Sequence, residues 1–127
     1  MSTSNESGLN AKQQDALKQK LLDARAALTN RRADQLKART GLRSEVEDEA
    51  DAANRAGNED ALVLLAESEH DRLGEIDHAL SKFESGEYGI DEDTGEPIGF
   101  ARLEVIPWAR YSAQTQEDHD REARERR

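Results

Sequence analysis

The sequence predicts a mainly α-helical protein, in which a long antiparallel two-helix coiled-coil hairpin carries a small vestigial zinc-ribbon-like globular module and a C-terminal helix. Hydrophobic residues make up 35% of the 127 residues and aromatic residues 4%, against 36% charged residues. This composition is poor for a compact sphere but sufficient for a narrow apolar seam between two helices. Two apolar stripes at helical spacing precede residue 86, and aromatic and β-branched residues concentrate after it.

The first helix of the hairpin is expected to begin at Asn10. Residues 1–9 are polar, small and unpatterned, which predicts a disordered leader. Asn10 and Gln13 have the spacing of a capping box, in which each side chain accepts a hydrogen bond from the other residue's backbone N–H. An apolar stripe at coiled-coil spacing follows: Leu17, Leu21, Ala24 and Leu28. The pattern continues towards Gly41, which gives a helix of roughly 30 residues and about 45 Å.

The second helix carries a better-defined stripe, which ends in an aromatic residue. Its members are Leu62, Leu65, Glu69, Leu73, Ile76, Leu80 and Phe83. Glu69 is the one carboxylate among them, and it either specifies the register of the seam or lies near its edge. The helix is expected to end at Ser85-Gly86, because glycine readily takes the left-handed conformation that terminates helices. The hairpin therefore spans residues 10–86, with an acidic tip near residues 42–53.

The charge distribution favours pairing within the chain and a protein partner. The net charge of -10 argues against sequence-specific DNA binding, which requires a concentrated basic surface. Residues 10–43 hold nine Lys or Arg against three Asp or Glu, whereas residues 44–96 hold three against eighteen. Opposite charges favour an intramolecular hairpin, although each exposed pair contributes only about 0.2–1 kcal/mol. A monomer is expected, with an antiparallel dimer as the alternative.

Several function classes lack any feature in the sequence. There is no run of eighteen apolar residues and no charged-then-apolar leader, so a cytoplasmic protein without a membrane segment is expected. Zero cysteines exclude disulfide and thiol chemistry. No nucleophile elbow, phosphate loop or dinucleotide-binding turn is present, so we expect neither an enzyme nor a cofactor. A calcium loop starting at Asp91 fails at the required positions Gly95, Glu96 and Arg102.

Residues 87–127 predict the ribbon-like module and its C-terminal helix. Two pairs, Asp91/Thr94 and Ser112/Thr115, are separated by seventeen residues and stand where a four-cysteine zinc ribbon carries its two CxxC pairs. None of the four supplies a thiolate or imidazole, so no metal is expected. The apolar cluster, which includes Trp108, and hydrogen bonds from side chains to backbone are expected to hold the module instead.

The order of these elements resembles the DksA/TraR family of transcription regulators over roughly residues 11–126. The family's ribbon signature is similar to four parts of this stretch: Glu87-Tyr88-Gly89, the xxxxGxxI step from Asp91 to Ile98, the triplet Arg102-Leu103-Glu104, and Pro107. The spacing of the two vestigial pairs is that of the family's four cysteines. Asp51 lies forty residues before Asp91, and the family's tip motif DxxDxA is present at this distance as residues 48–53.

The resemblance implies that the hairpin enters the secondary channel of bacterial RNA polymerase and alters promoter-complex stability. Asp48, Asp51 and Ala53 would then form the functional tip. The alternative is that these acidic residues only cap the second helix, whose N-terminal dipole favours negative charge. A competing function is a structural or adaptor hairpin that binds another protein or self-associates.

The resemblance also implies a link to the stringent response, since the family's best-studied members bind guanosine tetraphosphate through basic residues on the second hairpin helix and just after the last cysteine. The equivalent positions here are Ser68, Glu75 and Gln116, none of which is a cation. The sequence therefore predicts weak or absent sensitivity to that nucleotide through this surface. The loss of all four cysteines likewise predicts independence from zinc.

Overall fold

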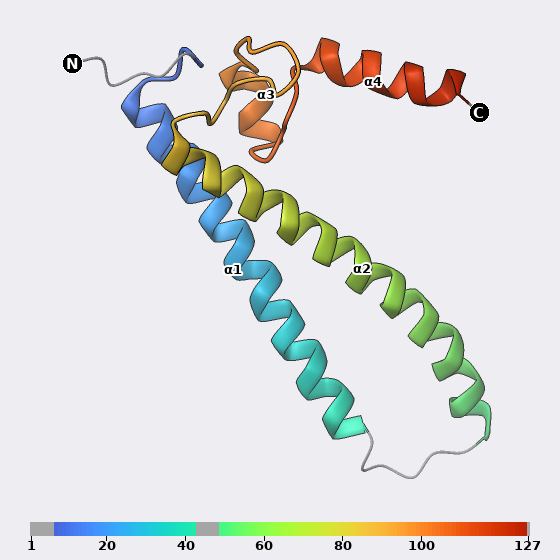
Figure 1. The fold of residues 1–127 in the computed structure, drawn as a ribbon. Helices are drawn as coiled ribbons and strands as arrows, with labels where there is room; N and C mark the ends of the chain where they lie inside the picture. Colours follow the sequence, from blue (N-terminus) through green and yellow to red (C-terminus); the bar gives the residue numbers. More distant parts are fainter. Residues whose placement is uncertain (1–6, 43–48, 127) are drawn as a thin grey trace.

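The computed structural model describes residues 7–42 and 49–126, without the side chains of residue 35 and residues 38–59. Its elements are α1 (Ala11–Leu42), α2 (Glu49–Ser85), α3 (Phe100–Val105) and α4 (Ala113–Glu125). Figure 1 shows α1 and α2 as an antiparallel hairpin, with α3 and its loops at one end and α4 projecting away. The mainly helical hairpin fold predicted from the stripes is confirmed. Among the described residues, the ribbon-like module has one isolated antiparallel bridge, between Ile90 and Pro97.

Both predicted helix boundaries of the hairpin are confirmed by their hydrogen bonds. The Gln13 N–H donates to Asn10 Oδ1 at 2.8 Å, and the Asn10 N–H donates to Gln13 Oε1 at 3.0 Å. This reciprocal pair is a capping box. At the other end, Gly86 has a φ of 78°, and the Glu87 N–H donates to the Lys82 carbonyl at 2.9 Å. That six-residue closure is a Schellman motif, which ends α2 at Ser85.

The disordered leader predicted for residues 1–9 is wrong for its last residues. Leu9 is only 2% exposed and belongs to the hydrophobic core, and Ser7 is also buried. Gly89, with a φ of 85°, makes room for them, because a Cβ there would lie 2.8 Å from Ser7 Cβ and 2.9 Å from Leu9 Cδ1. The start of the chain therefore packs against the module, a contact that no local pattern indicates. Residues 1–6 lie outside the described residues.

The hairpin and the module share one hydrophobic core at the base of the molecule. Its buried members come from both parts of the chain: Leu9, Leu17, Leu21, Ile76, Ala79, Tyr88, Ile98 and Leu103. Tyr88 is fully buried, its ring stacks on Phe83 with 4.0 Å between centroids, and its hydroxyl donates to the Pro107 carbonyl at 2.8 Å. From the sequence, a compact core is expected only in the module. The structure extends that core into the hairpin, because both apolar stripes end at the module.

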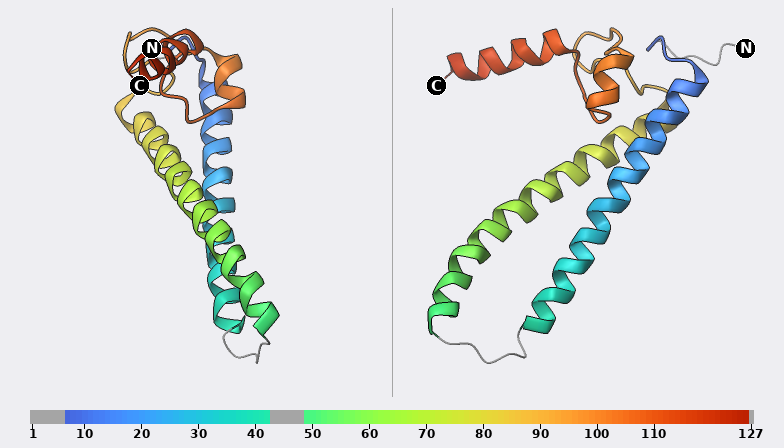
Figure 2. Two further views of the ribbon diagram at one scale, coloured as in Figure 1. Left: turned by 90° about the vertical axis from the view of Figure 1, so that its right-hand side faces the viewer. Right: turned by 180° about the vertical axis from the view of Figure 1, so that it is seen from behind.

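The seam between the two helices is packed more tightly near the module than towards the tip. Figure 1 shows the far ends of α1 and α2 apart, while the left-hand view of Figure 2, turned by 90°, shows the two helices crossing along their length. Leu21 and Ile76 are fully buried near the base, whereas Leu62 and Leu65 are 44% and 47% exposed. The seam expected along the whole hairpin is therefore closed only in the half that adjoins the module.

Among the described residues, no helix has the length and apolarity needed to span a membrane.

Candidate functional site

The predicted tip, near residues 42–53, includes the last residue of α1 and the first residues of α2, which lie at the opposite end of the hairpin from the module (Figure 1). Asp48 falls outside the described residues. Asp51 and Ala53 belong to the first two turns of α2, and their side chains are not described. Their functional role remains a prediction.

The Asp91 carboxylate occupies the centre of the ribbon-like module, where the sequence predicts a vestigial zinc-ligand position. Asp91 is 1% exposed. Its Oδ1 accepts the backbone N–H groups of Asp93 and Thr94 at 2.8 and 3.0 Å. Its Oδ2 accepts the backbone N–H of Ser112 at 2.8 Å, 21 residues further along the chain. One carboxylate therefore ties together the two turns that a zinc ribbon would join through its metal.

The other three vestigial positions contribute hydroxyl groups to their own turns. Ser112 is the N-cap of α4, where its Oγ accepts the Thr115 N–H at 3.2 Å and donates to Thr115 Oγ1 at 3.0 Å. Thr94 Oγ1 accepts the Glu96 N–H at 3.2 Å. The structure thus brings Asp91, Ser112 and Thr115 together, while the Thr94 hydroxyl bonds within its own loop.

This donor set does not fit the zinc ion of a four-cysteine ribbon. Zinc at such sites requires thiolate or imidazole donors, and here three of the four side chains are neutral hydroxyls. Both carboxylate oxygens of Asp91 already accept backbone N–H groups. Within residues 7–42 and 49–126, no cluster of three or more His, Cys, Asp or Glu is arranged to hold a metal.

The environment of Asp91 keeps its carboxylate ionised. Burial by itself raises the pKa of this group. Hydrogen bonds from the backbone N–H groups of Ser112, Thr94 and Asp93, and from the Thr115 side chain, outweigh burial and hold the pKa of Asp91 well below its ordinary 3.8. A carboxylate that accepts several N–H bonds is stabilised in its charged form. The module therefore has a permanent negative charge at its centre.

A charged cluster joins the module to α2, and we call it the joint cluster: Glu75, His78, Lys82, Glu92 and Arg110. Arg110 binds Glu75 in a bidentate ion pair, with Nε–Oε2 and Nη2–Oε1 distances of 2.8 and 3.1 Å. Glu92 accepts from Lys82 Nζ at 2.5 Å and contacts His78 Nε2 at 2.7 Å. These contacts link three residues of α2 to two loop residues of the module. They oppose rotation of the hairpin about its base.

The pKa shifts within the joint cluster favour its charged forms. Burial raises the pKa of Glu92, but hydrogen bonds and charge attraction from Lys82 and His78 lower it by more, so the net pKa lies below its ordinary value. The Glu75 hydrogen bond raises the pKa of Arg110. Sequence reasoning missed this cluster. The available signal was the placement of Glu75, His78 and Lys82 on one face of α2, but nothing local identifies Glu92 and Arg110 as their partners.

Two further contacts position the module and α4. The Arg72 guanidinium lies over the Trp108 ring, 4.2 Å from its centroid, and Trp108 packs against the core as the sequence predicts. His119 of α4 bonds Asp93 through its Nε2 at 2.8 Å, and its ring lies 4.5 Å from that of Tyr111. Both contacts use side chains of the module's loops, so the module holds α2 and α4 at once.

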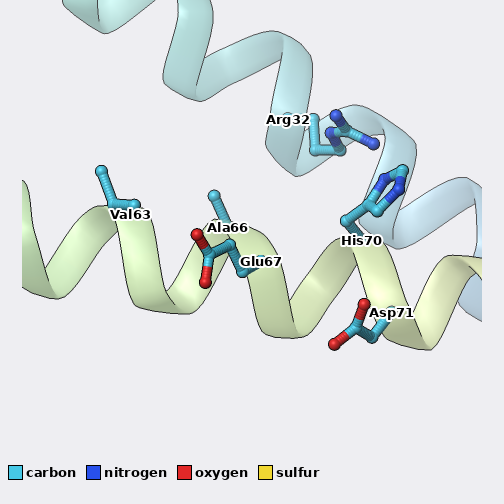
Figure 3. Close-up of a pocket in the computed structure, with 6 residues that line it drawn as sticks. All are labelled: Arg32, Val63, Ala66, Glu67, His70 and Asp71. Atoms are coloured by element: carbon cyan, nitrogen blue, oxygen red, sulfur yellow. The ribbon is translucent and has the colours of Figure 1, made fainter.

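A shallow groove of about 410 Å³ lies beside the seam (Figure 3). Figure 3 shows Arg32 on α1 facing residues of α2, and the lining comprises Arg32, Val63, Ala66, Glu67, His70 and Asp71. Two basic and two acidic side chains share it with two small apolar ones. The groove is thus solvated and has no arrangement of nucleophile and base that would indicate catalysis.

Comparison with known proteins agrees with the arrangement of the hairpin and module. The family model described as the prokaryotic dksA/traR C4-type zinc finger matches residues 86–121. The RNA polymerase-binding transcription factor DksA of Caulobacter vibrioides is 39% identical over 119 residues, which cover 91% of this chain and 82% of that protein. The chain belongs to the DksA/TraR family. It is a family of transcription factors rather than enzymes.

The DksA/TraR assignment extends to the three-dimensional structure. The transcription factor DksA2 from Pseudomonas aeruginosa matches with a TM-score of 0.78 and 34% sequence identity, over 89% of this chain and 87% of that one. General stress protein 16O of Bacillus subtilis is 39% identical over 54 residues, or 42% of this chain. Within this family, the chain described here lacks cysteine altogether.

Of the three positions that the resemblance equates with the family's nucleotide-binding residues, two bond to other side chains here. Glu75 is held by Arg110 in the joint cluster. Gln116 donates from its Nε2 to Asp120 Oδ1 at 3.0 Å, and Ser68 is exposed on α2. The predicted insensitivity to guanosine tetraphosphate through this surface stays a prediction.

Proposed function

We propose that this chain regulates transcription by binding bacterial RNA polymerase and inserting the tip of its hairpin into the secondary channel, which alters promoter-complex stability. The observation that supports the proposal is that residues 49–53 of the DxxDxA motif begin α2, at the end of this helix away from the module. The helices have 32 and 37 residues. At 1.5 Å per residue they form a rod of about 48–55 Å with the motif at its far end.

The chemistry of this end suits action inside a narrow channel. The motif supplies two carboxylates, those of Asp48 and Asp51, which can approach a basic or metal-containing site. Ala53 is small and permits close approach. The module contributes no metal to this mechanism, since the Asp91 carboxylate and the joint cluster hold the base of the hairpin.

The proposal specifies the partner and the location of the protein. The net charge of -10 opposes contact with DNA phosphates, so polymerase rather than a DNA sequence is the target. A polymerase partner places the chain in the bacterial cytoplasm, and channel entry requires a monomer. Regulation through the tip is independent of zinc and, through Ser68, Glu75 and Gln116, of guanosine tetraphosphate.

In vitro transcription with the cognate polymerase tests the role of the tip. We expect D48N/D51N to retain helicity and polymerase binding while losing most of its effect on transcription, because the side chains keep their size and lose their charge. The matched control is E67Q/D71N, which removes two exposed charges from the shaft of α2 and should behave like the wild type. Equal transcription by the tip variant and the wild type would return Asp48 and Asp51 to a helix-capping role.

The competing function, an adaptor or self-associating hairpin, draws on the exposed apolar residues of the tip half. Leu62, Val63, Leu64 and Leu65 are each at least 44% exposed on α2. Analytical ultracentrifugation separates the two functions. A monomer that binds polymerase fits channel insertion, whereas a tight dimer that buries residues 62–65 would contradict it.

A further inference from the structure

Glu69 places a buried carboxylate inside the seam of the hairpin. Its exposed fraction is 5%, and its Oε1 accepts from Arg31 Nη1 of the opposite helix at 3.0 Å. The second oxygen, Oε2, is buried without a hydrogen-bond partner in the described structure. The Arg31 side chain is 57% exposed, so the pair extends from the seam to solvent. Of the two alternatives left by the sequence, the structure excludes a position at the edge of the seam.

The ion pair lies where the seam changes from closed to open. On the module side, Leu73 is partly buried and Ile76 fully buried. On the tip side, the next stripe residues, Leu65 and Leu62, are exposed. The groove of Figure 3 opens beside this point, with Arg32 on one helix and charged residues on the other. The change in packing therefore coincides with the only carboxylate in either stripe.

The hydration of the ion pair explains why the closed seam ends at this point. Tightly packed helices have axes about 8–10 Å apart, which leaves room for apolar side chains but not for the hydration of a charge. Burying an unpaired carboxylate costs several kcal/mol, so Glu69 requires a partner. The long side chain of Arg31 provides it from the surface. Glu69 is already buried, so closing the seam over this pair would also dehydrate the Arg31 guanidinium, whose side chain is 57% exposed.

We propose that Glu69 and Arg31 form a spacer that ends the closed seam and keeps the tip halves of α1 and α2 apart. Glu69 is then a positioning residue for the tip, since the separation of the helices sets how far the end of α1 lies from the start of α2. This second statement rests on the proposed function. The spacer itself is a property of the free protein.

The stripes show what the spacer prevents. Leucine at position 69 would complete a run with Leu65 and Leu73 at spacings of four residues. Leucine at position 31 would follow Leu28 by three residues and continue the coiled-coil spacing of α1. Replacing a buried ion pair by packed apolar residues is often neutral or stabilising. The variant R31L/E69L should therefore close the seam further towards the tip.

Spin-label distances measure this closure directly. The chain has no cysteine, so A33C/A61C introduces two labels at exposed sites on α1 and α2 without background. In this labelled protein, R31L/E69L should shorten the mean distance and raise the melting temperature by several degrees. E69Q retains a polar group that can accept from Arg31 and should keep the wild-type distance. E84L, which adds leucine at an exposed site near the base, is the matched control and should change neither quantity.

An unchanged distance in R31L/E69L, or a lower melting temperature, would overturn the spacer whatever the transcription assay shows. The positioning role has a separate readout. R31L/E69L should reduce the effect on transcription although the protein is more stable, and E69Q should restore it. Full transcription activity in a variant with closed arms would overturn the positioning role. If the wild type itself lacks any effect on transcription, the proposed function fails, and a shortened distance still supports the spacer.

Discussion

The module and the hairpin each bury a carboxylate, and the two carboxylates differ in how many hydrogen bonds they accept. In the module, both oxygens of the Asp91 carboxylate accept backbone N–H groups, and the surrounding chain is tightly packed. In the hairpin, Glu69 has one ion-pair partner and one buried oxygen without a hydrogen bond, and the apolar residues beyond it are exposed. A fully satisfied buried charge makes its surroundings more rigid, whereas a buried polar atom without a partner costs stability.

The largest loss of stability is expected from a substitution at Asp91. Replacement by alanine should destabilise the module by about 2–4 kcal/mol, because three backbone N–H groups lose a charged acceptor. Trp108, in the same module, reports the loss through its fluorescence during urea unfolding. A smaller effect than that of an ordinary surface substitution would show that the carboxylate does not hold the two turns together.

Two controls accompany this measurement. E96A removes a nearby exposed carboxylate and should leave stability within about 0.5 kcal/mol of the wild type. A chelator should leave the wild-type curve unchanged, because the vestigial positions offer no donor set for zinc. Sensitivity of the wild type to chelation would show that the module recruits a metal through other residues.

The same carboxylate predicts the direction of the pH dependence. The folded pKa of Asp91 lies below its ordinary value of 3.8, so its contribution to stability is fully present above pH 3.8 and is lost as the pH falls through the folded pKa. The difference in unfolding free energy between the wild type and D91N should therefore shrink in acid. Urea titrations at a series of pH values measure it, and a difference that grows in acid would contradict the assignment.

A smaller effect is expected in the joint cluster. A double-mutant cycle with R110A and E75A should give a coupling free energy of about 0.5–1 kcal/mol, because the pair is bidentate but partly exposed. The cycle R25A and D77A, at an ion pair between the two helices near the base, serves as the reference. No coupling between Arg110 and Glu75 would leave the hydrophobic core as the main attachment of the module.

The features that were predictable from sequence are local. Asn10 and Gln13 cap α1 through groups three residues apart, and Gly86 ends α2 through its own backbone conformation. The buried positions near the base, such as Leu17 and Ile76, follow from helical periodicity. Each of these depends on interactions within one or two turns of chain, which the order of residues expresses directly.

The features that escaped prediction depend on partners far away in the chain. Leu9 is buried because Gly89 leaves space for it, and Arg110 finds Glu75 across 35 residues. Asp91 was identified as a vestigial position, but its role in joining the two turns required the location of the Ser112 N–H. Such contacts depend on how the elements meet, which single-sequence patterns do not contain.

The order of residues was sufficient to predict the helices and their ends, the lack of zinc donors, and the distance from the module to the acidic motif. These features depend only on the spacing and the chemical type of the residues. Packing in three dimensions was needed to show that one carboxylate replaces the metal as the link between two turns. It also showed that another carboxylate lies where the seam opens. The reason is that the fate of a buried charge depends on which donors surround it, and those donors come from separate elements.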